Sequence, residues 1–509
     1  MRKLVEITLA LAFFSIFTIG CTNKIEVSDP FIEVEPEADQ EEVESDYTIT
    51  LSIDNLLTSI YLYNDEYKTL DRNTSLRYDI FFSTTLMSMK TNALDLKTND
   101  SGSYLHSSVA RVTSSATKSS IDSSYDYIVS SYGFHSIELF NYSNNKWVNV
   151  KNVFAGSDAD NNGVKRGSVI THINGTQIGS MSNISSTLLY PSLGSNITLT
   201  LYGGESITLT AKSTTASPIM ANEIYEIGEK KIGLLSYTRF NPNFDTELAN
   251  AFATFSSAQI TDLILDLRLN SGGNINTGVD VTSMIAGDKA VDKTILNLRF
   301  NTSLTDDYEN TETKFSIGTM EYNPENSLFK LLSDNVAAGN RLNLSTKNVY
   351  CIVTDDTASV SELVINSLRG LGFEVTIIGD TRSYNDATNG KNVGSVTYHQ
   401  TRGSYTYYIF ATMYEIFNTN GEGGYENGFK FDHKVNEYNS NWHYTNYGQD
   451  EPLIAKAIEL ITGTTRTATA NSHSAAATDS SNFKVESYRI QGDSSYNMSF
   501  SSEIPLCTE

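Results

Sequence analysis

The chain has 509 residues, with 60 acidic and 36 basic side chains and a formal net charge of -24. This length exceeds what one hydrophobic core supports and predicts two or three domains. The negative charge argues against binding to nucleic acid, whose phosphates require basic surfaces. Three cysteines are too few for a disulfide framework.

The N-terminus has the pattern of a secretory signal. Arg2 and Lys3 precede an apolar run, which is followed by Thr18, Ile19, Gly20 and Cys21. The run is shorter than the about 20 residues that a membrane-spanning helix needs. A small residue directly before a cysteine resembles a bacterial lipoprotein processing site. The resemblance implies that residues 1–20 are removed and that Cys21 carries a lipid anchor in the cell envelope. The alternative is an ordinary cleaved signal with an incidental cysteine.

Three regions of different character follow the signal. Residues 21–49 are rich in Asp and Glu and predict a disordered, self-repelling tether. Residues 50–98 carry apolar side chains at helical spacing, among them Ile53 and Leu57, and predict a small helical region. The serine-rich stretch from there to residue 131 has no sustained period and is interpreted as a connector.

Residues 131–215 contain short apolar runs between turn signals and predict a small β-rich domain. An Asn-Gly pair, Asn174 and Gly175, is typical of a tight hairpin turn. Residues 161–175 resemble a helix-turn-strand signature of PDZ domains. A loop at the place that receives a peptide carboxylate in that family is formed by Tyr132, Gly133, Phe134 and His135. The resemblance implies peptide capture at a strand edge and at the N–H groups of this loop. The alternative is a β-rich domain whose glycines serve only turns.

Residues 220–462 alternate buried-type strands with helical segments. This rhythm predicts an α/β domain, a parallel sheet covered by helices, in which sites gather at the carboxyl ends of strands. The Ser-, Thr- and Ala-rich residues 463–509 predict a disordered tail.

Three short segments of the α/β domain lie where strands are predicted to end. The first runs into Gly272 and Gly273, whose backbone N–H groups can face a ligand, although alone it is a common strand-exit turn. The second contains Ser359, which forms the sequence of a helix capping box with Glu362 but also stands where a nucleophile is well placed. The third contains Lys391, which alone is typical of a solvated surface lysine.

Together the three segments resemble the ordered motifs of the tail-specific, or C-terminal processing, serine peptidases of family S41. Residues 266–273 resemble D-L-R-x-N-x-G-G, residues 357–362 resemble T-A-S-A-S-E, and residues 388–391 resemble T-x-G-K. The resemblance extends over roughly residues 50–462. It implies a crotonase-like βαβ catalytic domain at residues 220–462 with the PDZ-like domain inserted before it.

The resemblance also implies roles for single residues. Ser359 would be the nucleophile and Lys391 its general base, with an oxyanion hole formed by the N–H groups of Val360 and of Gly272 or Gly273. A lysine can act as a base only if burial lowers its pKa well below about 10.4.

Two features of this chain depart from the family pattern. Residues 382–387 look like an insertion, which could displace Lys391. Ser395 stands where well-studied members carry a glutamine that orients the base, although a serine can still donate or accept a hydrogen bond.

The expected function is therefore a serine endopeptidase of the bacterial cell envelope that acts on proteins or peptides and is held to the membrane by lipid. No cofactor or metal is expected, because the seven histidines form no metal-binding motif and no Walker-type loop occurs. No histidine occupies a position that suggests a base. Two alternatives remain open: a catalytically inactive peptide-binding lipoprotein, and an enzyme that acts on small acyl substrates like the crotonase relatives.

Overall fold

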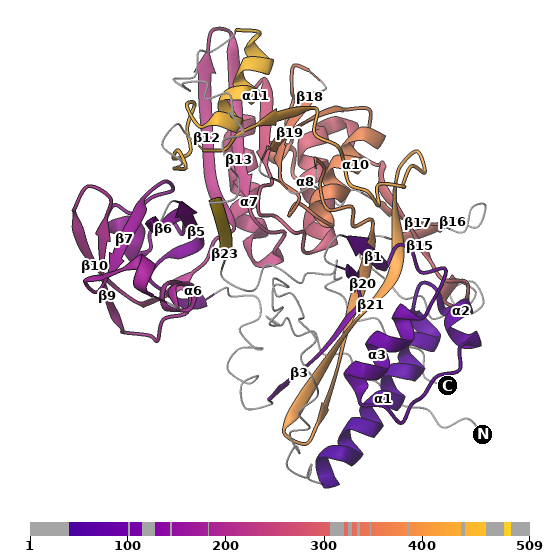
Figure 1. Ribbon diagram of the computed structural model, residues 1–509. Helices are drawn as coiled ribbons and strands as arrows, with labels where there is room; N and C mark the ends of the chain where they lie inside the picture. Colours follow the sequence, from indigo (N-terminus) through magenta and orange to yellow (C-terminus); the bar gives the residue numbers. More distant parts are fainter. Residues whose placement is uncertain are drawn as a thin grey trace.

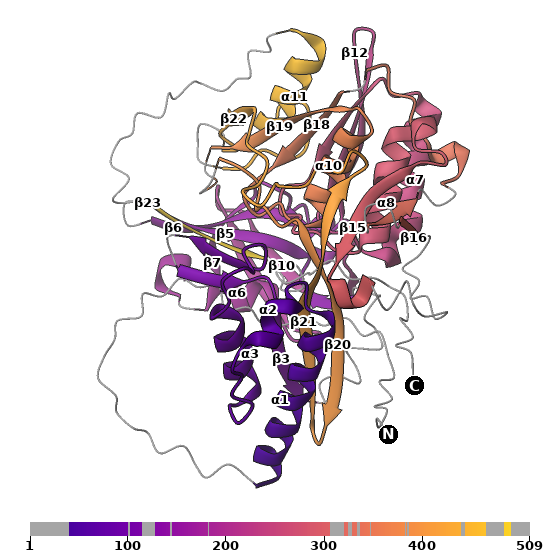
Figure 2. The ribbon, with the colours of Figure 1, turned by 90° about the vertical axis from the view of Figure 1, so that its right-hand side faces the viewer.

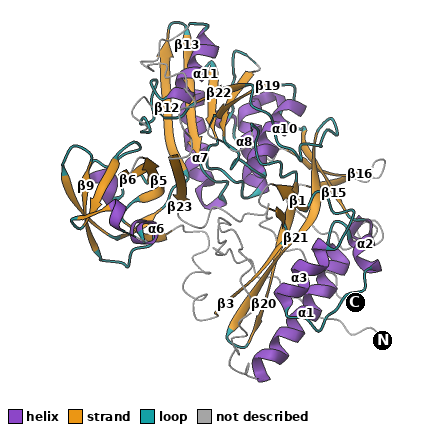
Figure 3. Ribbon diagram, viewed as in Figure 1, coloured by secondary structure: helices purple, strands orange, loops and turns teal. Residues whose placement is uncertain are grey.

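The computed structural model (Figure 1) describes residues 40–99, 102–113, 128–142, 145–181, 183–305, 320–323, 328–332, 336–346, 348–381, 383, 386–438, 443–464 and 483–489. The signal segment with Cys21 lies outside these residues. Within the described ranges no helix is long and apolar enough to cross a membrane. Figure 3 shows helices gathered at the N-terminal end of the chain and around one sheet, and a separate β-rich domain.

The N-terminal region contains three helices, α1 (Gln40–Ile60), α2 (Asn64–Thr69) and α3 (Tyr78–Met87). The predicted tether was wrong at its end, because α1 begins at Gln40 and not after residue 49. Acidic residues in the first turns of a helix interact favourably with its dipole. Ile49, Ile53 and Leu57 then continue as a fully buried apolar stripe.

The stretch interpreted as a connector contains strands. β1 (Leu96–Asn99) and β2 (Gly102–Leu105) form an antiparallel hairpin. β3 (Ser108–Thr113) then pairs with β21 (Tyr405–Asn418), which belongs to a distant part of the chain. Such long-range pairing leaves no periodic signal in a short serine-rich sequence, so the connector interpretation was wrong for these strands.

The β-rich domain, residues 128–215, has its own hydrophobic core. Its larger sheet has the order β10-β9-β7-β6-β5-β23. Asn174 and Gly175 both have positive φ, 50° and 77°, which confirms the predicted tight turn. The elements of the domain are β4 (Ile128–Ser131), β5 (Phe134–Tyr142), β6 (Asn145–Val153), α5 (Asp158–Asn161), β7 (Val169–Ile173), β8 (Thr176–Gln177), η1 (Ile178–Ser180), α6 (Ile184–Leu189), β9 (Asn196–Leu201), β10 (Ser206–Thr210) and β11 (Lys212–Thr215).

The C-terminal tail contributes the last strand of this sheet. β23 (Phe483–Arg489) pairs antiparallel with β5 over its whole length (Figure 2). The prediction of a wholly disordered tail was therefore wrong for this strand. The sequence Phe-Lys-Val-Glu at the start of β23 alternates apolar and polar residues, which is the period of a strand. That signal is short and lies in a polar segment.

The α/β domain contains a six-stranded sheet with the order β12-β13-β14-β18-β19-β22. In this sheet the strands β13, β14, β18, β19 and β22 run parallel to one another, and β12 is antiparallel to β13. The predicted α/β class is confirmed. The elements are β12 (Ile219–Ile227), β13 (Lys230–Tyr237), η2 (Pro242–Phe244), α7 (Asp245–Ala258), β14 (Asp262–Asp266), α8 (Ile275–Ala286), η3 (Gly287–Lys289), η4 (Ala338–Asn340), β18 (Asn348–Val353), α10 (Val360–Gly370), β19 (Glu374–Asp380), β22 (His433–Val435) and α11 (Pro452–Thr462).

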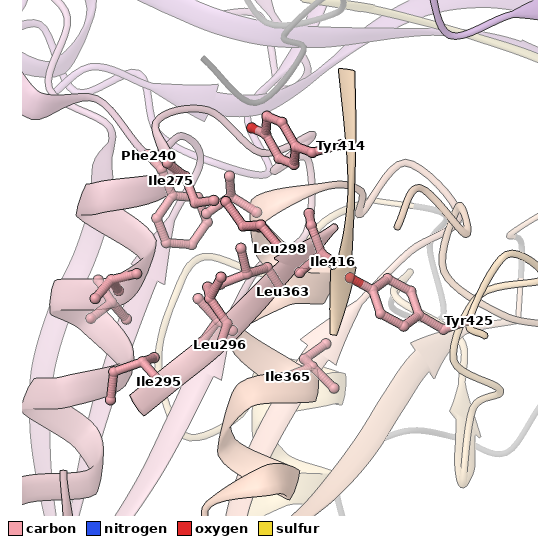
Figure 4. Close-up of a cluster of buried hydrophobic side chains, with 14 of the residues drawn as sticks. Phe240, Ile275, Ile295, Leu296, Leu298, Leu363, Ile365, Tyr414, Ile416 and Tyr425 are labelled. Carbon is pink, nitrogen blue, oxygen red and sulfur yellow. The ribbon is translucent and has the colours of Figure 1, made fainter. Parts of the chain in front are cut away.

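A second, antiparallel sheet has the order β16-β17-β15-β21-β20. Besides β21 and β3, which pairs with β21, its strands are β15 (Thr294–Phe300), β16 (Met320–Asn323), β17 (Leu328–Leu332) and β20 (Val393–Arg402). The long β20–β21 hairpin extends from the α/β domain to the N-terminal helices (Figure 2). Figure 4 shows side chains of α10, β15 and β21 meeting in one core, among them Leu363, Leu298 and Ile416.

A buried ionic cluster joins the β-rich domain to the α/β domain. Arg268, just after β14, bonds to Asp266 at 2.7 Å, to Glu437 at 2.8 Å and to Glu451 at 2.6 Å. Arg166 of the β-rich domain bonds to the same Glu437 at 2.5 Å. None of these side chains is more than 4% exposed. The cluster therefore brings Arg166 and Arg268, which belong to separate sequence motifs, into one buried contact between the β-rich domain and the α/β domain.

Candidate active site

Ser359 lies in the turn between β18 and α10, and it has a conformation that is rare for a residue with a side chain. Its φ is 59° and its ψ is -117°, whereas a helix N-cap normally has extended backbone. Ser359 and Glu362 occupy the two positions of a capping box. The Ser359 N–H donates to the Glu362 Oε2 at 3.0 Å, whereas the Ser359 side chain makes no cap hydrogen bond. The Ser359 Oγ is buried and has no hydrogen-bond partner among the described residues. Such strained turns are typical of nucleophile positions.

The glycine loop after β14 lies directly against Ser359. A Cβ on Gly272 would be 2.7 Å from the Ser359 Cβ and 2.9 Å from the Val360 nitrogen, closer than real Cβ atoms approach. Gly272 also has a φ of +112°. Only glycine therefore allows the loop to approach the serine turn this closely.

The backbone N–H groups around Ser359 are not equally available. The N–H of Gly272 donates to the Asn270 Oδ1 at 2.9 Å. The residues on either side of Gly273 bond to Phe240: the Phe240 N–H donates to the Gly272 carbonyl at 3.0 Å, and the Asn274 N–H donates to the Phe240 carbonyl at 2.8 Å. The N–H groups of Gly273 and Val360 have no partner within the described part of the chain. Of the two glycines left open by the sequence, the geometry favours Gly273 as a donor beside Val360.

One carboxylate joins the lysine segment to the serine turn. The Glu362 Oε2 accepts the N–H of Ser359 at 3.0 Å and the N–H of Lys391 at 2.8 Å. The two backbone nitrogens therefore lie within about 6 Å of each other. The Glu362 Oε1 accepts the N–H of Gly390 at 2.6 Å and the hydroxyl of Thr388 at 2.5 Å. The insertion before Lys391 thus does not move this segment away from the serine.

Glu362 was predicted only as a partner in a capping box. Its side chain is fully buried, and burial raises the pKa of its carboxyl, while the four donors stabilise the charged form. We infer that the Glu362 carboxyl is ionised, because a protonated carboxyl would have to turn its O–H toward one of these four donors.

Burial lowers the pKa of Lys391 to about 8, against the smaller opposing effects of the Asp95 and Glu362 carboxylates. This value brings a lysine into the range where a substantial fraction is neutral near physiological pH. A lysine that acts as a general base needs a pKa lowered by burial, and Lys391 meets this condition.

Asp95, from the N-terminal region, is part of this site and was not predicted. Its fully buried carboxylate accepts the hydroxyl of Tyr61 at 2.6 Å, the N–H and hydroxyl of Ser107 at 2.7 and 2.8 Å, and the hydroxyl of Thr412 at 2.9 Å. Four donors hold a negative charge that acts on Lys391. No local pattern in the sequence links Asp95 to a lysine in so distant a part of the chain.

His106 lies near Asp95 and was not predicted as part of this site. Its backbone N–H donates to the Asp95 carbonyl at 2.9 Å, and its Nε2 is shielded from solvent without a partner among the described residues. Burial and the charges of Lys391 and Lys97 lower its pKa well below the usual range. His106 is therefore a neutral imidazole beside Lys391.

Ser395 lies in β20, opposite Thr412 in β21. Paired residues of an antiparallel sheet face the same side, so Ser395 lies on the side of the Asp95 group. Its buried Oγ makes no hydrogen bond within the described residues and therefore does not hold Lys391. The charges that act on Lys391 come from Asp95 and Glu362.

The predicted carboxylate loop is at the start of β5. Tyr132, Phe134 and His135 are buried there, and the His135 ring packs edge-on against Phe154 at 5.3 Å. The Gly133 N–H donates to the Ser131 Oγ at 2.8 Å, so this N–H is already engaged. The described residues contain no group of three or more His, Cys, Asp or Glu side chains that could hold a metal ion.

A buried serine at a strand-to-helix turn, a lysine of lowered pKa and available backbone N–H groups supply the parts of a serine-type acyl-transfer site. Residues 231–435 match the model of Peptidase family S41. This region of the chain is thus similar to the peptidase domains of family S41.

The relatives of the chain agree with this assignment. A stretch of 134 residues is 28% identical to carboxyl-terminal-processing peptidase 2, chloroplastic, of Arabidopsis thaliana; it covers 25% of this chain and 26% of that protein. The chain therefore spans about a quarter of the length of this relative. A putative S41 protease from Bacteroides fragilis NCTC 9343 has the same fold, with a TM-score of 0.60 and 20% identity over 82% of this chain and 98% of that one.

Proposed function

We propose that the protein is an endopeptidase of the cell envelope in which Ser359 is the nucleophile and Lys391 the general base. The observation that carries the proposal is the shared carboxylate of Glu362, which holds the Ser359 and Lys391 backbones together. The lowered pKa of Lys391 supports it, as does the Ser359 hydroxyl, which has no partner among the described residues.

The proposed reaction proceeds in two steps. Neutral Lys391 takes the hydroxyl proton of Ser359 while Oγ attacks the carbonyl carbon of the peptide bond. The N–H groups of Val360 and Gly273 stabilise the oxyanion, and each such donor typically contributes on the order of 3 kcal/mol. The C–N bond then breaks, and the leaving amine takes the proton from Lys391. Water, deprotonated by Lys391, hydrolyses the acyl-enzyme and regenerates the serine.

The pH dependence of casein hydrolysis tests this function. Because the base must be neutral, activity is lost as the pH falls through the pKa of Lys391, which is about 8. We expect kcat/KM to rise about tenfold from pH 7 to pH 9 and then to level off. The Ser359→Ala form serves as the blank at every pH. An activity that is flat across this range argues against a lysine base, and no hydrolysis at any pH favours the inactive peptide-binding protein.

We further propose that the β-rich domain is PDZ-like and delivers extended peptides to Ser359. The buried ionic cluster supports this role, because it holds the β-rich domain against the α/β domain in one orientation. The loop from Tyr132 to His135 and the adjoining strand β5 would bind the peptide.

The anchoring of the protein is also a proposal, and it rests on the sequence alone. We expect Cys21→Ser to move the protein from the membrane fraction to the soluble fraction, because the lipid would have no attachment site. Metabolic labelling with a fatty acid measures the modification directly. Wild-type protein that takes up no label, and a variant that stays in the membrane fraction, would together exclude the anchor.

A further inference from the structure

The outer edge of β5 is occupied by the chain's own tail. All residues of β23 are in register with β5, from Phe483 opposite Tyr142 to Arg489 opposite Ser136. β23 is the last strand in the sheet order, so it covers an edge that would otherwise expose unpaired backbone groups.

The direction of β23 is the direction a captured peptide would need. The loop from Tyr132 to His135 directly precedes most of β5, so a peptide whose C-terminus reaches this loop must run antiparallel to β5. β23 does so, and its C-terminal residue Arg489 pairs with Ser136, the next residue after the loop. The tail therefore lies along the same edge and with the same polarity as the expected ligand.

We propose that the segment Phe483–Arg489 is a built-in competitor for peptides at the edge of β5. This inference rests on the proposed peptide capture by the β-rich domain. The chain continues beyond Arg489 as far as Glu509, so the tail offers backbone hydrogen bonds but no carboxylate at the loop. A peptide that ends at the loop offers both and can displace the tail.

The covalent connection between β23 and the rest of the chain makes the competition strong. Residues 465–482 link β23 to Thr464, which lies just after the end of α11. A short covalent connection gives an effective concentration on the order of 1 mM at the edge. If the free segment binds with a Kd on the order of 100 μM, the tail weakens binding of an external peptide about tenfold.

The test measures peptide binding to the mature chain with and without a functional tail strand. The probe is a fluorescent peptide of the sequence Phe-Lys-Val-Glu-Ser-Tyr-Arg with a free carboxylate, and its amide is the comparison. One variant ends at Thr464. A second keeps the full length but carries Val485→Pro and Glu486→Pro. Adjacent N–H groups point to opposite edges of a strand, so two neighbouring prolines remove at least one donor that faces β5. Ser474→Pro in the linker is the matched control.

We expect the truncated chain and the double-proline variant to bind the peptide about tenfold more tightly than the full chain and the Ser474→Pro control. Hydrogen exchange should show β5 amides that lose protection in both tail variants. Equal binding in all four proteins overturns the competitor and leaves peptide capture standing. Binding in none of them, with unchanged exchange in β5, overturns both. A peptide and an amide that bind equally would contradict the carboxylate loop alone.

Discussion

We expect Ser359→Ala and Lys391→Ala each to lower kcat/KM for casein by on the order of 10⁴-fold, and the double variant to be no worse than either. Nucleophile and base act as one unit, so removal of one leaves the other without a function. Lys391→Arg should fail equally, because a guanidinium is not deprotonated near neutral pH. Steady-state kinetics at pH 9, where Lys391 is mostly neutral, give the clearest comparison.

Two further variants make this result specific. Lys434→Ala removes a lysine whose ion pair with Asp386 is half exposed, and it should keep full activity. His106→Gln removes the neutral imidazole beside Lys391 and should keep most of the activity if lysine is the base. Hydrolysis that survives Lys391→Ala but is lost in His106→Gln would assign the base to His106 and refute the Ser-Lys dyad.

We expect Arg268→Met to destabilise the protein by about 3–5 kcal/mol, because it leaves buried carboxylates with too little positive charge. Asp266 would lose both of the guanidinium bonds that Arg268 supplies, and Glu437 and Glu451 would each lose one of their two arginine partners and keep Arg166. Calorimetry should show a fall in Tm on the order of 10 °C.

The matched control for this prediction is Arg341→Met. Arg341 pairs with Asp288, which is 92% exposed, so the change should cost about 0–1 kcal/mol. An equally small effect of Arg268→Met would mean that the cluster does not hold the two domains together. A fall in Tm with unchanged casein hydrolysis at low temperature would confine Arg268 to stability and exclude a direct role in the reaction.

Several predictions of the fold were correct because they depend on local patterns. The alternation of β13, α7, β14, β18, α10 and β19 follows from short buried strands and amphipathic helices, whose periods are visible in the sequence. The turn at Asn174 and Gly175 follows from the positive φ that these residues tolerate. The tail and the connector were misread because β23 and β3 are strands only by virtue of partners distant in the chain.

Some features of the candidate site could likewise be predicted from the sequence, and others could not. The sequence determined that Ser359 stands between a strand and a helix and that Lys391 follows in a matching motif, because both are features of spacing along the chain. The sequence alone could not decide whether Ser359 is a helix cap or a nucleophile, because both roles suit a serine at this position. In the structure the backbone angles of Ser359 depart from those of an ordinary N-cap, and its Oγ has no partner among the described residues.

Only the tertiary structure decided the electrostatics of the site. The pKa of Lys391 depends on how much water its ammonium group loses, and the placement of Asp95 and His106 depends on contacts between segments far apart in the chain. The choice of Gly273 over Gly272 depends on a hydrogen bond to Asn270. Burial, opposing charge and the pairing of N–H groups arise only when distant segments meet, so the sequence could name the candidate residues but not their protonation states or hydrogen-bond partners.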